Sequence, residues 1–126
     1  MTKNTVLLID DDYDVAFGAS LRLQAAGYET LTAHDGQAGV DVARRRHPAA
    51  IVLDVRMPRM NGLVALANLQ HDQRTKDIPI VMLSASLVDQ QAALDAGARY
   101  FLTKPYQPTT LVTAVGKVIA ENHYDS

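Results

Sequence analysis

The stretch "VLLIDDDYD", residues 6–14, joins four aliphatic residues to three consecutive carboxylates. The aliphatic part fits a buried strand. Like charges a few ångströms apart repel one another, however, and partial burial raises that penalty. A cluster of this kind persists where something positive occupies it. The stretch therefore predicts a buried strand that ends at a bound cation or a basic side chain.

The composition is that of one globular domain. The chain has 126 residues, of which 48% are hydrophobic and 21% charged, and this is enough to bury a single core. A net charge of -2 gives no general attraction for nucleic acid or an anionic membrane. The absence of cysteine excludes disulfides and thiolate metal sites, and no apolar run approaches membrane-spanning length. We expect a single cytoplasmic domain over residues 1–126, without direct nucleic-acid or membrane contact, and with a frayed polar tail at Glu121–Ser126.

Short apolar runs alternate with longer helical patterns, which is typical of βαβ units and a parallel sheet. Four of the five runs lack polar alternation, as strands covered on both faces do. The second run alternates, so we place it at an edge. The pattern predicts an α/β fold, a doubly wound parallel sheet of the flavodoxin-like (βα)5 type with strand order 2-1-3-4-5. The expected strands are Thr5–Ile9, Tyr28–Ala33, Ala50–Leu53, Ile80–Leu83 and Tyr100–Thr103.

Several residues mark the ends of the expected helices. Gly27 and Gly97 each follow a helical pattern, where a left-handed C-terminal cap would lie. Ser86 is placed to cap the start of the fourth helix. Asp12 and Asp14 are typical of the cap and first turn of the first helix, where acidic residues are favoured.

Polar residues follow four of the expected strands: Asp10 and Asp11 the first, Asp54 the third, Ser84 the fourth and Lys104 the fifth. The carboxyl ends of parallel strands share one edge, with neighbouring strands about 4.8 Å apart, and ligands of open α/β sheets bind there. Carboxylates suit Mg²⁺, which shares its remaining ligands with water or phosphate. A phosphoryl group would meet the metal, an ammonium and a hydroxyl, while a carboxylate attacks it. Asp54 is the best-placed nucleophile because its strand is central, although spacing leaves open which acid attacks.

The segments "VLLIDDD", "IVLDVRMPRMNG", "IVMLSAS" and "AGARYFLTKPY" occur in this order over nearly the whole chain. Together they resemble the receiver domain of two-component response regulators, the CheY-like family. The resemblance implies a signalling switch of a two-component system or phosphorelay, in which a histidine kinase or histidine phosphotransfer protein donates a phosphoryl group to Asp54. It implies a phosphoacceptor regulatory domain that catalyses only its own phosphorylation and dephosphorylation.

The resemblance also implies roles for the site residues. Asp11 and Asp54 would ligate Mg²⁺ together with the backbone carbonyl of Arg56, and Asp10 would act mostly through water. Ser84 and Lys104 would contact the phosphoryl oxygens. The Arg56 side chain, two residues after the acceptor, could shield the phosphoryl group or touch Asp10.

The switch of the family maps onto this chain as well. On phosphorylation, Ser84 would move towards Asp54 and Phe101 would turn inward. Phe101 has no hydroxyl, so burial alone would hold it. A downstream protein would then bind through the fourth and fifth helices and the fifth strand. The same mapping implies a cis peptide bond at Lys104-Pro105.

Three other functions compete with the switch. A haloacid-dehalogenase-like phosphohydrolase would need a hydroxyl residue after its Asp-x-Asp motif, where this chain has Tyr13 and Asp14. A flavodoxin-like cofactor binder would need a phosphate cradle after the first strand, where three carboxylates repel phosphate. A receiver-shaped adaptor that never takes phosphate also remains. The chain could work alone or belong to a longer regulator or hybrid kinase.

The remaining features have plain structural interpretations. In the first helix, a stripe of Val15, Ala19, Leu23 and Ala26 is expected to face the core, which leaves Phe17 and Leu21 outward as a hypothetical docking patch for the donor or a second copy. Gly18 and Gly39 are expected to loosen their helices. Leu111, Val115 and Val118 form a core-facing stripe in the last helix. We interpret His34, His47, His71 and His123 as surface residues, Arg44–Arg46 as a solvated helix end, and Met57 and Met60 as packing residues.

Overall fold

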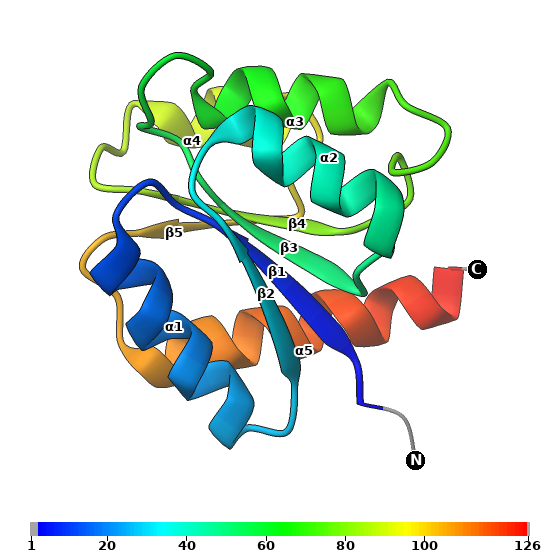
Figure 1. Cartoon of the computed structure of the whole chain (residues 1–126). Coiled ribbons are helices and arrows are strands. Elements are labelled where there is room, and N and C mark those ends of the chain that lie inside the picture. Colours follow the sequence, from blue (N-terminus) through cyan, green and yellow to red (C-terminus); the bar gives the residue numbers. More distant parts are fainter. Residues whose placement is uncertain (1–2, 126) are drawn as a thin grey trace.

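Five strands and five helices alternate along the chain in the computed structural model (Figure 1). The structure describes the backbone of residues 3–125 and the side chains of residues 3–122. The strands are β1 (Thr5–Ile9), β2 (Glu29–Ala33), β3 (Ala50–Asp54), β4 (Ile80–Ser84) and β5 (Tyr100–Thr103). The helices are α1 (Tyr13–Ala25), α2 (Gly36–Arg46), α3 (Gly62–Gln70), α4 (Asp89–Asp95) and α5 (Pro108–Asp125). All strand pairs are parallel and the order is β2-β1-β3-β4-β5, which confirms the predicted fold class.

Helices cover both faces of the sheet. In Figure 1, α2, α3 and α4 lie on one side of the strands, and α1 and α5 lie on the other. Successive residues of β1 point to opposite faces: Leu7 and Ile9 join the core under α2 and α3, while Val6 and Leu8 join the core under α1 and α5. A strand buried on both faces needs no polar alternation. β2 is the least buried of the first four strands, and it lies at an edge as predicted.

The ends of the helices follow the predicted signals with one exception. The Asp12 side chain accepts hydrogen bonds from the amides of Asp14 and Val15, so it caps α1. Gly27 and Gly97 have φ values of +102° and +112°, the left-handed conformation expected after a helix. The prediction for Ser86 is wrong, because residues 86–88 form a turn and α4 begins only at Asp89. The Ser86 hydroxyl accepts from the amide of Val88 inside that turn and caps no helix.

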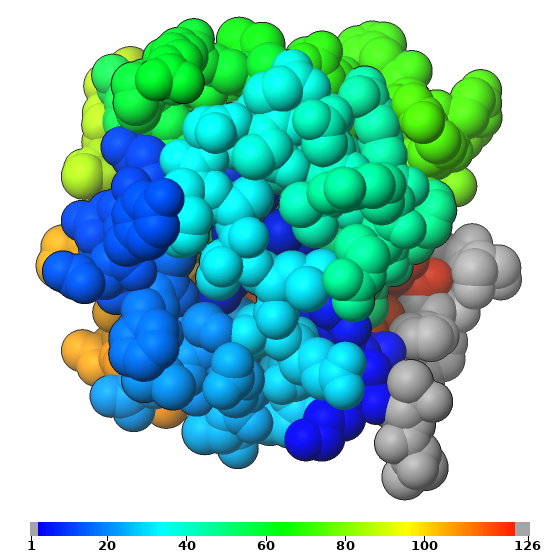
Figure 2. All heavy atoms as spheres, viewed as in Figure 1, coloured from blue at the N-terminus to red at the C-terminus, as the bar shows by residue number. Residues whose placement is uncertain are grey.

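The face of α1 that packs on the sheet is shifted by one residue from the predicted stripe. Ala16, Ser20 and Leu23 are buried, whereas Val15 and Ala26 are exposed. The reason is a polar contact that hydrophobicity alone does not reveal. The Ser20 hydroxyl lies 2.5 Å from the hydroxyl of Thr30 on β2, so this polar side chain is satisfied in an inner position of the helix. Figure 2 shows α1 in blue on this face of the molecule, beside β2 and α2 in cyan.

Phe17 and Leu21 point outward from α1, as expected. Their side chains are 64% and 49% exposed. The predicted stripe on α5 is also confirmed, since Leu111, Val115 and Val118 are buried. The α5 helix continues through Asp125, so the tail expected to fray from Glu121 is helical as far as that residue, and Ser126 lies outside the described residues. Among the described residues, none of the helices is both long and apolar enough to cross a membrane.

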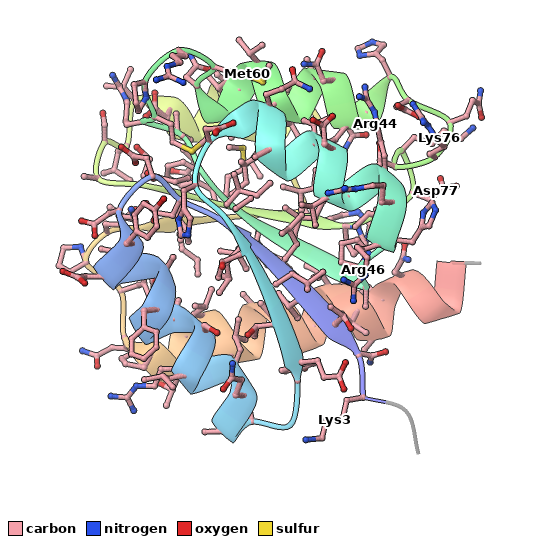
Figure 3. The ribbon with its side chains drawn as sticks, viewed as in Figure 1. Lys3, Arg44, Arg46, Met60, Lys76 and Asp77 are labelled. Atoms are coloured by element: carbon pink, nitrogen blue, oxygen red, sulfur yellow. The ribbon has the colours of Figure 1, made fainter. Side chains whose placement is uncertain are left out.

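The arginines at the end of α2 are not all solvated. The Nε atom of Arg44 lies 2.6 Å from Oδ2 of Asp72, which follows α3, and Arg74 pairs with the same carboxylate at 3.0 Å. Hydrogen bonds from Arg74 and then from Arg44 hold the pKa of Asp72 well below its usual value. Arg44 therefore ties α2 to the loop that carries Lys76 and Asp77 (Figure 3), while Arg45 and Arg46 are exposed as expected.

Glycine lets α2 pack closely on the sheet. A Cβ atom at Gly39 would collide with the side chain of Ile9 on β1, so the missing side chain sets the distance between helix and strand. The expectation that Gly39 loosens α2 is therefore wrong at the level of packing. A Cβ atom at Gly18 would meet nothing within 4 Å. Met57 is buried and Met60 packs partly buried against the core, as predicted for both (Figure 3).

Candidate functional site

Three carboxylates converge at the carboxyl edge of the sheet. Ile9 of β1 is paired with Leu53 of β3, so the residues that follow them, Asp10 and Asp54, lie side by side. Carboxylate oxygens of Asp10, Asp11 and Asp54 all lie within 4.8 Å of one another. Asp10 and Asp54 are each only 5% exposed, whereas Asp11 is open to solvent. The cluster is therefore two buried acids with a third at the mouth.

A lysine enters this cluster from the far strand. Ser84 of β4 is paired with Thr103 of β5, which places Lys104 at the same edge. The Nζ atom of Lys104 lies 3.1 Å from Oδ1 of Asp54 and 3.4 Å from Oδ2 of Asp10. The next peptide bond, Lys104-Pro105, is cis, as the family resemblance implied. The basic side chain that the opening sequence required is thus supplied by a residue ninety-four positions away.

The charges in the site shift the pKa of both central groups. Burial, and next the neighbouring charge of Asp10, raise the pKa of Asp54, and the ammonium of Lys104 offsets only part of this effect. Burial alone would lower the pKa of Lys104, but the carboxylates of Asp10 and Asp54 outweigh it and raise that pKa. One ammonium faces three carboxylates, so the site keeps an excess of negative charge that favours a further cation.

The donor set at the mouth fits a hard divalent cation. All three side chains present carboxylate oxygens, which Mg²⁺ and Ca²⁺ prefer, and the group holds no sulfur or imidazole ligand. Asp11 is exposed and can keep water around an ion, as Mg²⁺ requires. The residues present are therefore suited to a metal of this kind.

Ser84 and Arg56 both bind one residue that the sequence analysis missed. The hydroxyl of Ser84 donates to Oδ2 of Asp89 at 2.6 Å. The guanidinium of Arg56 holds the same carboxylate through Nε at 2.9 Å and Nη2 at 3.1 Å. Among the described residues, Arg56 thus pairs with Asp89, and its side chain forms no hydrogen bond or ion pair with Asp10. Hydrogen bonds from Ser84 and then from Arg56 lower the pKa of Asp89, which is only 8% exposed.

The sequence analysis gave Asp89 no role, because nothing in the residue pattern sets this acid apart. An acid five residues after Ser84 lies in the first turn of α4, where acids are common for reasons of the helix dipole. The expected helix began at Ser86, which would have placed Asp89 a turn further along and away from Ser84. The position of the turn at residues 86–88 decides the contact, and sequence patterns locate such boundaries poorly.

His34 follows β2 and bonds to the backbone of the site, so it is not only the surface residue that the sequence analysis expected. It is half-buried, and its Nδ1 donates to the backbone carbonyl of Asp10 at 3.0 Å. Its ring stacks on Tyr13 with centroids 3.6 Å apart. His47 and His71 are exposed as expected, and the side chain of His123 lies outside the described residues.

Phe101 lies on β5 beside Met82 of β4 and is half-buried against the core on the side of the sheet covered by α2, α3 and α4. Its ring therefore has an apolar surface on one side and solvent on the other. An open apolar groove of about 540 Å³ lies on the opposite side of Lys104, between α1 and α5. Val15, Ala19, Lys104, Tyr106 and Leu111 line it.

The comparisons with known proteins agree with this geometry. Residues 6–116 match the family described as response regulator receiver domain. The chain belongs to that family, so it is a regulatory receiver domain of two-component signalling. It is 36% identical over 112 residues to the DNA-binding dual master transcriptional regulator RpaA of Synechocystis, a match that covers 87% of this chain and 46% of RpaA. The chain spans about half the length of the curated regulators it matches.

Solved structures show the same fold over their whole length. The chemotaxis protein CheY4 of Vibrio cholerae superposes with a TM-score of 0.86 at 33% identity, covering 93% of this chain and 99% of that one. The receiver domain of the sensor histidine kinase PA1611 of Pseudomonas aeruginosa superposes with a TM-score of 0.87 at 26% identity, covering 94% and 99%. That structure is described with a magnesium ion coordinated in its active-site cleft.

Proposed function

We propose that this domain is a phosphorylation-activated switch whose Asp54 accepts a phosphoryl group from a phosphohistidine. The donor would be a histidine kinase or a histidine phosphotransfer protein. The observation that carries the proposal is the position of Lys104, whose ammonium lies within 3.4 Å of both Asp54 and Asp10 at the edge of the sheet. A buried acid held beside a fixed cation is arranged to attack a phosphoryl group and to hold the product.

The chemistry requires one bond to form and one to break. An oxygen of the Asp54 carboxylate would attack phosphorus, while the bond between phosphorus and the donor imidazole breaks and its electron pair returns to the ring nitrogen. Lys104 would then neutralise negative charge on the phosphoryl oxygens, and the hydroxyl of Ser84 would donate to another oxygen. Asp54 is a regulatory acceptor in this scheme, and the domain would catalyse only its own phosphorylation and dephosphorylation.

The carboxylate cluster would hold Mg²⁺ through Asp11, Asp54 and the backbone carbonyl of Arg56, with Asp10 acting mostly through water. Bound there, the ion would neutralise charge that develops on the phosphoryl oxygens. Its relative PA1611 is described with magnesium in the corresponding kind of cleft. In this chain, the three carboxylates have the right ligand type and lie close enough together to share one ion.

The switch would be read at a surface next to the site. Ser84 would move towards the phosphoryl group, and Phe101, which is already half-buried, would turn further into the core. A downstream protein would bind the surface formed by α4, β5 and α5. We propose that residues 1–126 form a single domain that functions in the cytoplasm. With a net charge of -2, we propose no direct DNA contact by these residues, although RpaA is described as DNA-binding.

Intact mass measurement tests this function. We expect wild type incubated with Mg²⁺ and acetyl phosphate to gain the mass of one phosphoryl group, and Asp54→Asn to gain none. Asp41→Asn is the matched control, because Asp41 is an exposed acid on α2. Omission of Mg²⁺ should abolish the adduct. A wild-type chain that stays unmodified would favour the adaptor function, and steady turnover of a phosphate ester would favour the phosphohydrolase.

A further inference from the structure

We propose that Asp89 is a positioning residue that holds the hydroxyl proton of Ser84 and must release it before the phosphorylated form of the site can assemble. The proposal rests on the function proposed above and adds a residue to it. Neither the family resemblance nor the comparisons assign a role to this position.

A serine hydroxyl has a single proton. In this structure the Ser84 proton is donated to Oδ2 of Asp89, and the oxygen of the same hydroxyl accepts from the amide of Ser86 at 3.1 Å. Ser84 is 1% exposed, so its hydroxyl is shielded from bulk solvent. A phosphoryl oxygen on Asp54 would need that same proton. The two acceptors therefore compete for one donor, and only one of them can be satisfied at a time.

The bond to Asp89 is a strong competitor. Hydrogen bonds to an ionised acceptor are about twice as strong as neutral ones. Arg56 donates hydrogen bonds to both oxygens of the Asp89 carboxylate, which favours the charged form of that carboxylate and fixes its orientation. Asp89 is buried, and its ion pair with Arg56 keeps its carboxylate beside the Ser84 hydroxyl. The unphosphorylated site is thus held in place by three side chains that we call the Asp89 latch: Ser84, Arg56 and Asp89.

The latch also connects the site to the expected output surface. Asp89 is the first residue of α4, a helix of seven residues whose N-cap makes no side-chain hydrogen bond. Within the described part of the chain, Asp89 is the residue of α4 whose side chain is bonded to both β4 and the loop after β3. When the Ser84 hydroxyl donates to another acceptor, Asp89 loses one of these two hydrogen-bonded contacts. The first turn of α4 would then be less restrained.

Beryllium trifluoride, a mimic of the phosphoryl group, provides the test because it coordinates a carboxylate oxygen reversibly and requires no phosphoryl transfer. Its apparent affinity would be measured by calorimetry in the presence of Mg²⁺ for wild type, Asp89→Ala, Ser84→Ala and the double variant of the full chain. We expect Asp89→Ala to tighten binding about tenfold, the size of one competing charge-assisted bond. In the Ser84→Ala background, the same substitution should change the affinity less than about twofold.

Asp95→Ala is the matched control, since Asp95 is another acid of α4 whose contact is with the exposed Gln91. It should leave the affinity unchanged. Asp89→Asn keeps an oxygen that can accept from Ser84 but loses the charge, so we expect an intermediate gain, and this variant serves if Asp89→Ala does not fold. We expect hydrogen exchange at the amides of residues 87–91 to rise both in unligated Asp89→Ala and in wild type with the mimic.

The outcomes separate this proposal from the proposed function. If wild type binds the mimic with Mg²⁺ and Asp89→Ala binds it no more tightly, the latch is disproved while the phosphoacceptor function stands. An equal gain with and without Ser84 would show that Asp89 does not act through the hydroxyl. If wild type fails to bind the mimic at all, both proposals fall together.

Discussion

Asp54 combines two properties that a folding chain normally avoids in one residue. Its carboxylate is buried, and it lies beside two other carboxylates with a single lysine to balance them. Transfer of a charge from water into a protein interior costs free energy unless its partners compensate for it. The raised pKa of Asp54 shows that Lys104 compensates for only part of the cost.

We therefore expect Asp54→Asn to be more stable than wild type in metal-free buffer at pH 7, by about 1 kcal/mol in urea unfolding. The sign follows from linkage. An acid whose folded pKa is raised above its ordinary 3.8 binds its proton more tightly when folded, so stability falls as pH rises from 3.8 through the folded pKa. The gain should accordingly shrink below pH 4, where the carboxyl is protonated in both states.

The exposed control Asp41→Asn should give no comparable gain. A loss of stability in Asp54→Asn at pH 7 would mean that the ion pair with Lys104 outweighs burial and repulsion. Excess Mg²⁺ should make wild type more stable than Asp54→Asn, because only wild type retains all three carboxylates that would bind the ion.

Single residues show how far sequence reasoning reached in the site. Asp10, Asp11, Asp54 and Lys104 could be predicted to lie together because each follows or ends a parallel strand, and parallel strands share an edge. Asp89 could not, because its contact depends on where a three-residue turn ends. The partnership of His34 with the carbonyl of Asp10 was equally hidden, since a histidine at the end of an edge strand has no pattern that marks its partner.

At the scale of elements, the distance between helix and sheet depends on single positions. Gly39 packs α2 directly against Ile9, whereas Gly18 of α1 faces open space. The two glycines looked equivalent in the sequence, since both interrupt helical patterns. Periodicity also misplaced the inner face of α1, because Val15 and Ala26 look more apolar than Ser20. The effect of each glycine and the inner face of α1 are both decided by packing against a neighbouring element. The residue pattern of a single helix carries no information about that packing.

Alanine at these two positions should therefore act in opposite directions. We expect Gly18→Ala to stabilise the protein by about 0.5–1 kcal/mol, the helical advantage of alanine over glycine. Gly39→Ala should destabilise it by about 1–3 kcal/mol, because Ile9 and α2 must move to accommodate the new methyl group. Urea unfolding of the two variants against wild type measures both. Similar gains from both substitutions would show that Ile9 has room to rearrange.

At the scale of the whole molecule, the parallel sheet and its two-sided core followed from the alternation of elements, while the strand order is that of a flavodoxin-like sheet, and the family segments predicted the site at its edge. Sequence reasoning was weaker for surfaces. The outward position of Phe17 and Leu21 was expected, but the apolar groove between α1 and α5 was not. That groove forms only when residues 15–22 and 104–111 come together in space. Lys104 lines it, so the groove opens beside the proposed phosphoryl site.

Phe17 and Leu21 are exposed on α1, and the hypothesis that they form a docking patch for a protein donor can be tested directly. We expect Phe17→Ser combined with Leu21→Ser to slow phosphorylation by a phosphorylated histidine phosphotransfer protein about tenfold, because two exposed apolar contacts would be lost. Phosphorylation by acetyl phosphate should be unchanged, since that donor needs no docking surface. Time courses of the phosphorylated fraction with each donor provide the measurement. Equal rates with the protein donor would remove these residues from the docking surface.

Tyr106 makes the site visible without any added label. The chain contains five tyrosines and no tryptophan, so its intrinsic ultraviolet emission comes from tyrosine alone. Burial raises the pKa of Tyr106, and the charges of Lys104, Asp10 and Asp54 all act on its ring. The emission lost in Tyr106→Phe thus belongs to one ring at the rim of the carboxylate cluster. We expect arrival of an ion or a phosphoryl group to change this difference between wild type and Tyr106→Phe, so that occupancy of the site can be followed in real time without an added label.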